Sequence, residues 1–349
     1  DATCTITRNT ITNVQNLNTG GYSAAGIRLA SGNSHVVTNN LISGFLQYEN
    51  GSTGTFGAYG IYISAGTGHI IDNNSISTRL AGIGNGLSAG ENACLKINVG
   101  TSGLIIRNNI FEQNFTQFYA AGTYKWCVAM PTQTTLTMNN NAYFITPSGT
   151  VYGDGWNMTS GTYYQDAAFA GWVAVMQSFG TATNENAAQH YIGTAPFTSS
   201  TNLHIPAATV TSLESGGLNS GVGVDVDNQV RPGPAGSVNG GASAYDIGGD
   251  EFDGSIPSCS GTPTAGTISA APASGCYGYA TTMTLGGGSS FPGAGITNQW
   301  QYSSNGGGSW SNLAGQTGAA LSILVVSSNQ YRCNVTCTTS GISAATPRS

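Results

Sequence analysis

Hydrophobic and polar positions alternate in short segments along the first part of the chain, and these segments recur at a nearly constant spacing. Four copies begin at Gly26, Gly60, Cys94 and Cys127, so their starts lie 34, 34 and 33 residues apart. In each copy the alternating segment is followed by a second one that ends in neighbouring asparagines. The second segments cover 36–40, 70–74, 105–109 and 136–141, and a partial fifth copy covers 5–9. Strict alternation predicts β-strands with one face turned inward.

Repetition with this period predicts stacked coils of β-strands. One coil of a parallel β-helix takes roughly 20 to 25 residues, so each repeat carries a surface loop of about ten residues. The glycine-rich stretches 44–57 and 82–90 are typical of such loops. We therefore predict an all-β chain whose first domain, residues 1–254, is a right-handed parallel β-helix. Its repeats are expected over 3–146 and its closing coils over 147–254.

Stacking also predicts contacts between equal positions of neighbouring coils, which lie about 4.8 Å apart. The second or last asparagine of each group is expected to form a hydrogen-bonded ladder of Asn40, Asn74, Asn109 and Asn141. His35 and His69, which are 34 residues apart, are expected to stack as a structural pair. Cys94 and Cys127 occupy the same position in successive coils, which predicts a disulfide between them.

Composition supports a folded all-β chain and excludes several classes of function. Charged residues make up only 7% of the chain, hydrophobic residues 39%, and glycine occurs 51 times. The net charge of −6, without a basic patch, excludes nucleic-acid binding. No apolar run reaches the roughly 18 residues that span a bilayer. A signal-peptide pattern is also lacking at the start, so we expect a processed chain.

The cysteine pattern indicates disulfides rather than a metal centre. Seven cysteines form no CxxC motif, and only four histidines are present. This argues against a zinc site and favours disulfides in an oxidising compartment. Cys4 belongs to none of the disulfides that we predict, and we expect its partner upstream in a longer chain or in another chain.

The closing region carries an ordered set of positions: Trp172, Asn186, Phe197, Leu203-His204-Ile205, Asp225, Asp227, Arg231-Pro232, Asp246-Ile247-Gly248 and Glu251-Phe252. This set resembles the ending of a large family of secreted bacterial parallel β-helix proteins, often labelled choice-of-anchor domains. Asn228 stands where glycine is usual, Gly249 where alanine is usual, and the insertion 233–244 is long for the family. The resemblance covers residues 1–253 and implies a secreted or surface scaffold.

Residues 255–349 show a different pattern. Cys276, Trp300 and Cys333 follow one another, and Tyr331 lies two residues before the last of them. A tryptophan between two sheet-bridging cysteines, with such a tyrosine, is typical of an immunoglobulin β-sandwich. The segment resembles the Ig-like modules of large bacterial surface adhesins. The resemblance implies a core of Trp300 and Tyr331, a Cys276–Cys333 bridge across the sandwich, and a Cys259–Cys337 bridge holding the first strand.

Acidic residues gather in one part of the chain, with Arg231 among them: Asp225, Asp227, Asp246, Asp250, Glu251 and Asp253. One interpretation is a calcium site formed by Asp225, Asp227, Asp246 and Asp250, because calcium prefers oxygen ligands. The other, which we favour, is an Arg231 ion pair with hydrogen-bonded turns that close the β-helix. No other cofactor is predicted.

Catalysis is not predicted, although parallel β-helices also host polysaccharide lyases and glycoside hydrolases. Hydrolysis of a glycoside needs two carboxylates on one face, and among the repeats only Asp72 lies in the strand frame. Tyr48, Tyr59 and Tyr62 could contact a glycan, or they could pack the loops onto the coils. We expect a non-catalytic extracellular structural or adhesive module of a cell-surface protein or fibre. Its partners would be further copies or neighbouring domains of a longer chain. The alternatives are a carbohydrate-binding protein and a polysaccharide-degrading enzyme.

Overall fold

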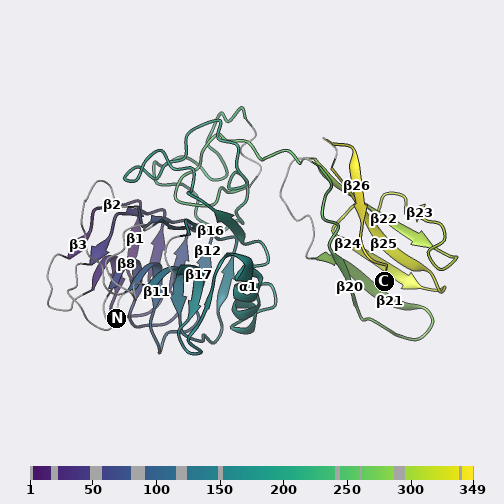
Figure 1. The fold of residues 1–349 in the computed structure, drawn as a ribbon, viewed down its shortest axis with the longest axis horizontal. Helices are drawn as coiled ribbons and strands as arrows, with labels where there is room; N and C mark the ends of the chain where they lie inside the picture. Colours follow the sequence, from purple (N-terminus) through teal and green to yellow (C-terminus); the bar gives the residue numbers. More distant parts are fainter. Residues whose placement is uncertain are drawn as a thin grey trace. The chain divides into compact units, whose positions relative to one another are not determined.

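The computed structural model describes residues 3–16, 23–47, 57–79, 91–114, 124–147, 152–239, 244–259, 261–286, 295–337 and 340–348. The chain divides into two compact units, Asp1–Ser255 and Ile256–Ser349. The boundary lies one residue beyond the one expected from the sequence. Each unit is described by itself below (Figure 1).

The first unit is a parallel β-helix in which successive coils add one strand to each of three sheets (Figure 1). The first sheet contains β1 (Thr5–Thr7), β5 (Val36–Thr38), β9 (Ile70–Asp72), β12 (Ile105–Arg107) and β15 (Thr137–Asn139). The second contains β2 (Thr10–Thr12), β6 (Leu41–Ser43), β10 (Ser75–Ser77), β13 (Ile110–Gln113), β16 (Ala142–Ile145) and β19 (Gln189–Ile192). The third contains β4 (Ala24–Leu29), β8 (Gly57–Ile63), β11 (Glu91–Ile97), β14 (Tyr124–Met130), β17 (Tyr152–Asn157) and β18 (Thr162–Tyr164), of which only β18 is antiparallel. A short parallel pair joins β3 (Gln15–Asn16) and β7 (Leu46–Gln47).

The register keeps equal positions of the repeats in line. Val37 lies opposite Ile71, and Ile71 lies opposite Ile106, so each sheet turns a continuous column of apolar side chains inward. These columns are fully buried and form one core inside the coils. A 3-10 turn, η1 (Asp166–Ala168), and the helix α1 (Phe169–Ser178) follow the last coils. The helix buries Trp172 and Met176 at the end of this core. Gly155 is required there, since a Cβ atom would lie 2.2 Å from the Trp172 ring.

The predicted asparagine ladder is present inside the coils. The side-chain amide of Asn40 donates to Asn74 at 2.9 Å, Asn74 donates to Asn109 at 3.0 Å, and Asn109 donates to Asn141 at 2.9 Å. Asn9 adds a step at the beginning, with a bond of 2.9 Å to Asn40. Each ladder amide also donates to backbone carbonyls, so the ladder amides are satisfied inside the protein.

The predicted histidine stack is present as well. The rings of His35 and His69 lie with their centroids 5.1 Å apart and 16° between their planes. Each ring bonds a backbone carbonyl of its own coil, that of Ser31 or Ala65. Burial lowers the pKa of His69, which favours the neutral ring.

The expectation that residues 147–254 continue as closing coils is wrong beyond β19. The segment 193–255, which we call the closing segment, is largely irregular and packs along the outer face of the second sheet. The asparagine that precedes each ladder residue has a left-handed backbone, with φ of 53° to 55°. Its side chain forms hydrogen bonds with this segment. Thus Asn39 donates to the Val224 carbonyl, Asn108 to Leu218 and Asn140 to Gly216. These amides lie at equal positions in successive coils. Because the segment bonds one after another of them, it runs across the stack of coils instead of adding a further coil.

The second unit consists of two antiparallel sheets. One contains β20 (Thr267–Ala271), β21 (Tyr279–Gly286) and β24 (Ala320–Val325). The other contains β23 (Ser311–Asn312), β22 (Ile296–Ser303), β25 (Gln330–Cys337) and β26 (Ile342–Ala345). Trp300 is fully buried, and its indole donates to the Gly318 carbonyl at 2.9 Å. Tyr331 packs against the same core and is partly buried.

The cysteines agree with only one predicted disulfide. Cys259 is bonded to Cys337, with their Cα atoms 5.6 Å apart. The Cys276–Cys333 prediction is wrong, because Cys276 lies in an exposed turn before β21 while Cys333 is buried on β25. Cys4 is an exposed free thiol.

The Cys94–Cys127 prediction is also wrong. Both thiols are buried and free, and both point at backbone carbonyls of the second sheet. Cys94 lies 3.3 Å from the Glu112 oxygen, and Cys127 lies 3.4 Å from the Phe111 oxygen. Burial raises the pKa of each thiol well above its ordinary value, so both behave as small core residues.

Replacing a central ladder residue is expected to destabilise the β-helix strongly. Asn74→Ala removes several buried hydrogen bonds and leaves backbone groups of the neighbouring coils without partners. We expect a loss of about 3 kcal/mol or more of unfolding free energy, measured by urea denaturation followed by circular dichroism. The control is Asn33→Ala, an exposed residue that also bonds the next coil through Thr67. Equal losses in both variants would contradict the role of the buried ladder.

The ladder ends on a buried acid, which predicts a pH effect. Asn141 donates to Glu185 at 3.0 Å and the Tyr143 hydroxyl at 2.5 Å, and burial raises the pKa of Glu185 from 4.5 to about 7. The folded state therefore holds the proton more tightly than the unfolded state. The contribution of Glu185 to stability is fully present below pH 4.5 and is lost as the pH rises toward 7, by about 1.4 kcal/mol per pH unit. Glu185→Gln should remove this contribution, so its stability should fall less steeply than that of the wild type between pH 4.5 and 7 and should be higher at pH 8. An unchanged slope would refute the assignment.

Candidate functional site

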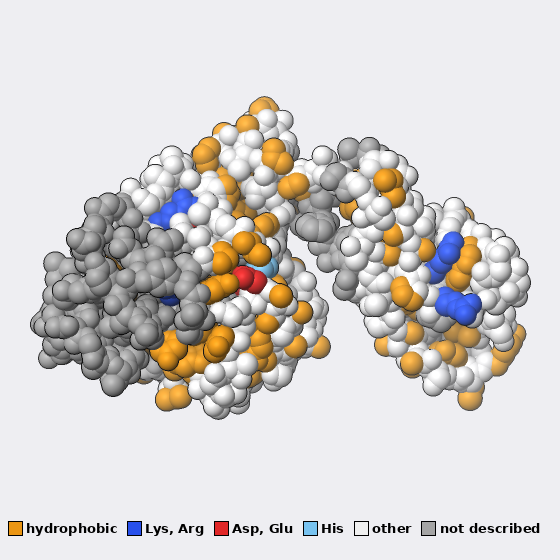
Figure 2. Space-filling model, in the orientation of Figure 1, with side chains coloured by type: hydrophobic (Ala, Val, Ile, Leu, Met, Phe, Trp, Pro, Cys, Tyr) orange, Lys and Arg blue, Asp and Glu red, His pale blue; other side chains and the backbone are white. Residues whose placement is uncertain are grey.

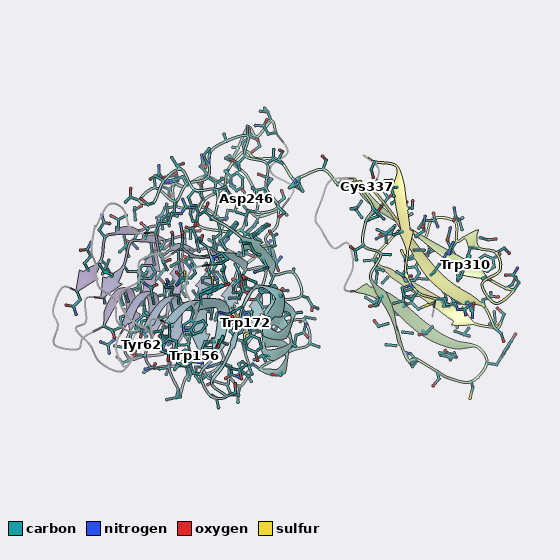
Figure 3. All side chains as sticks on the ribbon, in the orientation of Figure 1. Tyr62, Trp156, Trp172, Asp246, Trp310 and Cys337 are labelled. Atoms are coloured by element: carbon teal, nitrogen blue, oxygen red, sulfur yellow. A yellow bond between two sulfur atoms is a disulfide. The ribbon has the colours of Figure 1, made fainter. Side chains whose placement is uncertain are left out.

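Outward positions of the third sheet carry an aromatic surface, which we call the aromatic face: Tyr62, Tyr124, Trp126, Trp156 and Tyr163. Strand register produces it, since Tyr62 lies opposite Lys96, Ala93 lies opposite Trp126, and Lys96 lies opposite Ala129. Ala93 and Ala129 leave room for the neighbouring rings to lie over the sheet. Figure 3 labels Tyr62 and Trp156 on the same side of the first unit, and Figure 2 shows hydrophobic side chains gathered along the lower part of that unit.

Four rings of the aromatic face, those of Tyr124, Trp126, Trp156 and Tyr163, pack against one another. Tyr124 stacks on Trp156 with centroids 6.2 Å apart, and Trp126 stacks on Trp156 at 5.7 Å. Tyr163 also contacts Trp126, with its ring tilted and the centroids 5.7 Å apart. Trp126 is 1% exposed, whereas Tyr124 and Tyr163 are 38% and 46% exposed. A buried tryptophan thus supports a layer of rings that solvent reaches.

A buried ion pair lies beside these rings. The Lys96 ammonium is 2.5 Å from the Glu91 carboxylate and 5.0 Å from the centre of the Trp156 ring. Burial lowers the pKa of Lys96 and raises that of Glu91, and each partner opposes the shift of the other. The Tyr59 hydroxyl approaches the same carboxylate at 3.4 Å, and burial raises its pKa as well. The pair leaves no net charge under the aromatic face.

The three tyrosines singled out from the sequence have different positions. Tyr48 lies outside the described residues. Tyr59 is only 3% exposed, so the expectation that its ring contacts a ligand directly is wrong. Tyr62 is half-buried, accepts a hydrogen bond of 2.8 Å from Asn98, and lies under the Arg28 guanidinium.

Sequence reasoning missed most of the aromatic face. Alignment of Cys94 with Cys127 already placed Ala93 beside Trp126, so the repeat contained the signal for that ring. Trp156 and Tyr163 lie beyond the last recognised repeat, where the spacing changes. Tyr163 also reaches the face through the antiparallel strand β18, which no period of the repeat predicts.

The proposed four-aspartate calcium site does not form. Both oxygens of Asp225 accept backbone N–H groups, from Asp227 and Gln229 on one side and from Glu251 on the other. Those of Asp246 accept from Ser215 and Phe252. These two carboxylates therefore hold turns together, while Asp227 and Asp250 lie elsewhere, beside His204.

The alternative reading of this region, an arginine ion pair, agrees with the structure. Arg231 pairs with Glu251, and both side chains are completely buried. The guanidinium also donates to the Gly248 carbonyl at 2.8 Å and to Asn39 at 3.1 Å. Arg231 thereby joins the closing segment to the first sheet.

The remaining acid considered for catalysis is also engaged. Asp72 is 1% exposed and lies 2.5 Å from the Arg107 guanidinium. Burial raises its pKa, and the contact with Arg107 opposes that rise. Arg107 in turn donates to the Ser220 carbonyl of the closing segment. The Asp72–Arg107 pair fits a role in packing this segment.

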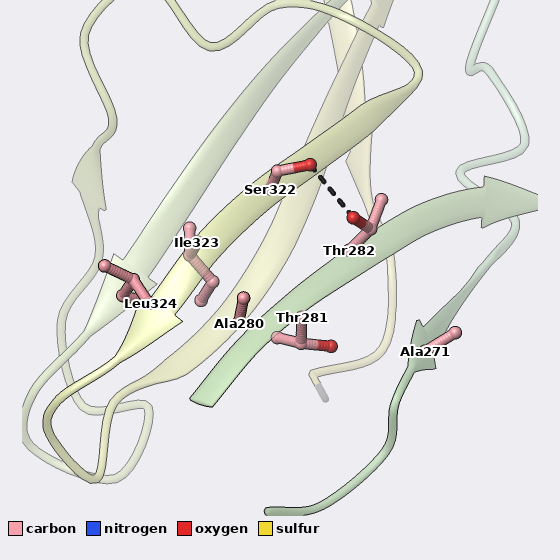
Figure 4. A pocket seen from close by; sticks show the side chains of 7 residues that line it. All are labelled: Ala271, Ala280, Thr281, Thr282, Ser322, Ile323 and Leu324. Atoms are coloured by element: carbon pink, nitrogen blue, oxygen red, sulfur yellow. Dashed lines mark hydrogen bonds between the residues drawn. The ribbon is translucent and has the colours of Figure 1, made fainter. Parts of the chain in front are cut away.

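A shallow hollow of about 420 Å³ lies on β21 and β24 of the second unit (Figure 4). Its lining consists of Ala271, Ala280, Thr281, Thr282, Ser322, Ile323 and Leu324. Thr282 and Ser322 share a hydrogen bond of 2.9 Å between their hydroxyls. None of these lining side chains titrates, so the hollow offers no acid–base chemistry.

Comparison with known proteins identifies the architecture. The right handed beta helix region family matches residues 1–186, which is more than half of the chain. The chain belongs to this family. No curated protein and no solved structure matches it significantly. Within the described part of this β-helix protein, no helix has the length and apolar character needed to span a membrane.

The Lys96–Glu91 pair should be a coupled unit in the β-helix. Lys96→Met alone leaves a buried carboxylate without its cation, and we expect it to lower the unfolding free energy by about 3–5 kcal/mol. The double variant Lys96→Met with Glu91→Gln should recover most of that loss, because no charge remains buried. A double-mutant cycle by urea denaturation measures the coupling. Additive effects would contradict the pairing.

Proposed function

We propose that this chain is a non-catalytic extracellular adhesive module that binds carbohydrate through the aromatic face of its β-helix. The observation that carries the proposal is the stacked layer of Tyr124, Trp156 and Tyr163 over buried Trp126. Aromatic rings offer large, rigid contact area at low entropic cost, and recognition surfaces are enriched in them. Their flat faces suit the apolar faces of sugar rings.

The charge of the surface favours a neutral glycan. Lys96 is neutralised by Glu91, and Arg28 lies at the Tyr62 end, away from Trp156. A polyuronate would require unpaired cations along the face. The carboxylate described beside the aromatic face, that of Glu91, is buried and paired with Lys96. Glycoside hydrolysis needs a second carboxylate across the scissile bond, so we favour binding over turnover.

The second unit supports the adhesive part of the proposal. Its sheets of three and four strands enclose Trp300, as in an Ig-like sandwich. The Cys259–Cys337 disulfide suits an oxidising, extracellular compartment. Ig-like modules commonly serve as spacers in surface proteins, so this unit would connect the β-helix to neighbouring domains of a longer chain.

The proposal predicts saturable glycan binding that depends on Trp156. The full chain would be titrated calorimetrically with cellohexaose, xylohexaose, mannohexaose and oligogalacturonate. We expect at least one neutral hexasaccharide to bind, and Trp156→Ala to weaken that binding about tenfold or more. Tyr163→Ala should weaken it less, because that ring lies at the edge of the layer.

The matched control is Trp310→Ala, since Trp310 is also half-buried and lies under Arg332 in the second unit. It should bind like the wild type. Equal weakening by Trp156→Ala and Trp310→Ala, or the absence of binding to every glycan, would refute the aromatic face as the binding surface. Release of shortened products would show instead that the chain is an enzyme.

A further inference from the structure

A second cluster of chemically capable side chains lies in the closing segment, apart from the aromatic face. His204, Asp227 and Asp250 come from three separate stretches of the closing segment, and one ligand atom of each lies within 4.8 Å of the others. The Nε2 atom of His204 is 3.1 Å from the Asp227 carboxylate. The sequence separates these residues by more than twenty positions each, so only the fold of the closing segment brings them together.

Hydrogen bonds orient His204 toward the two carboxylates. The side-chain oxygen of Asn202 accepts the backbone N–H of His204 at 3.2 Å, which identifies that atom as an acceptor. The same oxygen lies 2.5 Å from the His204 Nδ1 atom. Because an acceptor faces Nδ1, that nitrogen carries the proton, and the lone pair of a neutral ring is on Nε2. An outer partner on one ring nitrogen is typical of histidines that bind metal through the other.

The inner end of the cluster is buried, and the hydrogen-bonding capacity of its polar atoms is not fully used. His204 Nε2 is shielded from solvent and makes no hydrogen bond, although it faces Asp227. Asp250 is only 5% exposed, and its described hydrogen bond is from the Ile205 N–H at 2.7 Å. Arg231, the nearby buried arginine, is paired with Glu251 instead. A lone pair and two carboxylates thus converge, and among the described residues no Lys or Arg forms an ion pair with either carboxylate. The Arg8 guanidinium bonds the neighbouring Asn228 instead.

The outer end of the cluster is open. The Asp227 side chain is 55% exposed, and its backbone N–H is held by Asp225 at 2.9 Å. A ligand could therefore enter from solvent on the Asp227 side without displacing the core. Asp225, which fails as a ligand itself, positions the turn that presents Asp227.

We propose that His204, Asp227 and Asp250 form a site for a divalent first-row transition cation. The imidazole nitrogen favours such a cation over calcium or magnesium, which prefer all-oxygen ligand sets. Three protein ligands leave coordination positions for water on the exposed side. The bound ion would join three stretches of the closing segment and hold them against the second sheet. The competing description is an imidazolium–Asp227 ion pair without a metal.

Zinc binding to the full chain tests the proposal. The protein would be treated with EDTA, dialysed, and titrated with Zn²⁺ by calorimetry at neutral pH. We expect saturation at one equivalent that raises the thermal unfolding midpoint. Asn202→Ala should weaken binding about 10- to 100-fold, as expected for loss of an outer partner. Asp227→Asn and His204→Gln should weaken it at least as much.

Asp253→Asn is the control, because this neighbouring carboxylate bonds the N–H groups of Val238 and Asn239 outside the cluster. It should bind zinc like the wild type. Asp227 is exposed, so Asp227→Asn is expected to fold, and circular dichroism verifies this. Undiminished zinc binding by Asp227→Asn and His204→Gln would overturn the proposal, as would the absence of a one-equivalent phase. Saturation by calcium but not by zinc would overturn the assignment to a transition metal. Because glycan binding is measured on different side chains, either proposal can fail alone.

Discussion

Hydrogen bonding between equal positions of successive coils is the constraint on which this structure depends. A parallel stack turns backbone groups at its corners away from regular strand pairing, and burial makes each unpaired group costly. Asn40, Asn74, Asn109 and Asn141 supply a donor and an acceptor at one corner of every coil. This ladder keeps the coils in register, so every column of side chains, inside and outside, follows from it.

The asparagine that precedes each ladder residue extends this constraint to the outside. Its left-handed backbone turns the chain between the first two sheets, and its side chain bonds the closing segment. Irregular chain can be packed there because the coils present amides at regular intervals. The same packing assembles His204, Asp227 and Asp250, so the candidate metal site depends indirectly on the ladder. On the third sheet, the same register aligns the rings of the aromatic face.

Prediction from the sequence succeeded where one residue type repeated at one position. The ladder and the His35–His69 stack required only the period and the strand spacing. The prediction failed where two cysteines at equal positions in neighbouring coils were expected to form a disulfide. Cys94 and Cys127 do lie at equal positions in successive coils. Their side chains run side by side, however, and each thiol points at a backbone carbonyl instead of at the other thiol. Cys276 failed for another reason, because the strand that was expected to carry it begins only at Tyr279.

The sequence by itself determined the β-helix, since its period, alternation and asparagine pairs each specify contacts between neighbouring coils. It also determined the division near residue 255, where the pattern changes. Only the tertiary structure decided the path of the closing segment, because that path depends on contacts between residues 76 to 185 positions apart. It likewise decided which acids hold turns and which remain to face His204. The tertiary structure also decided that the Tyr59 side chain is buried, which the residues around it in the sequence did not indicate.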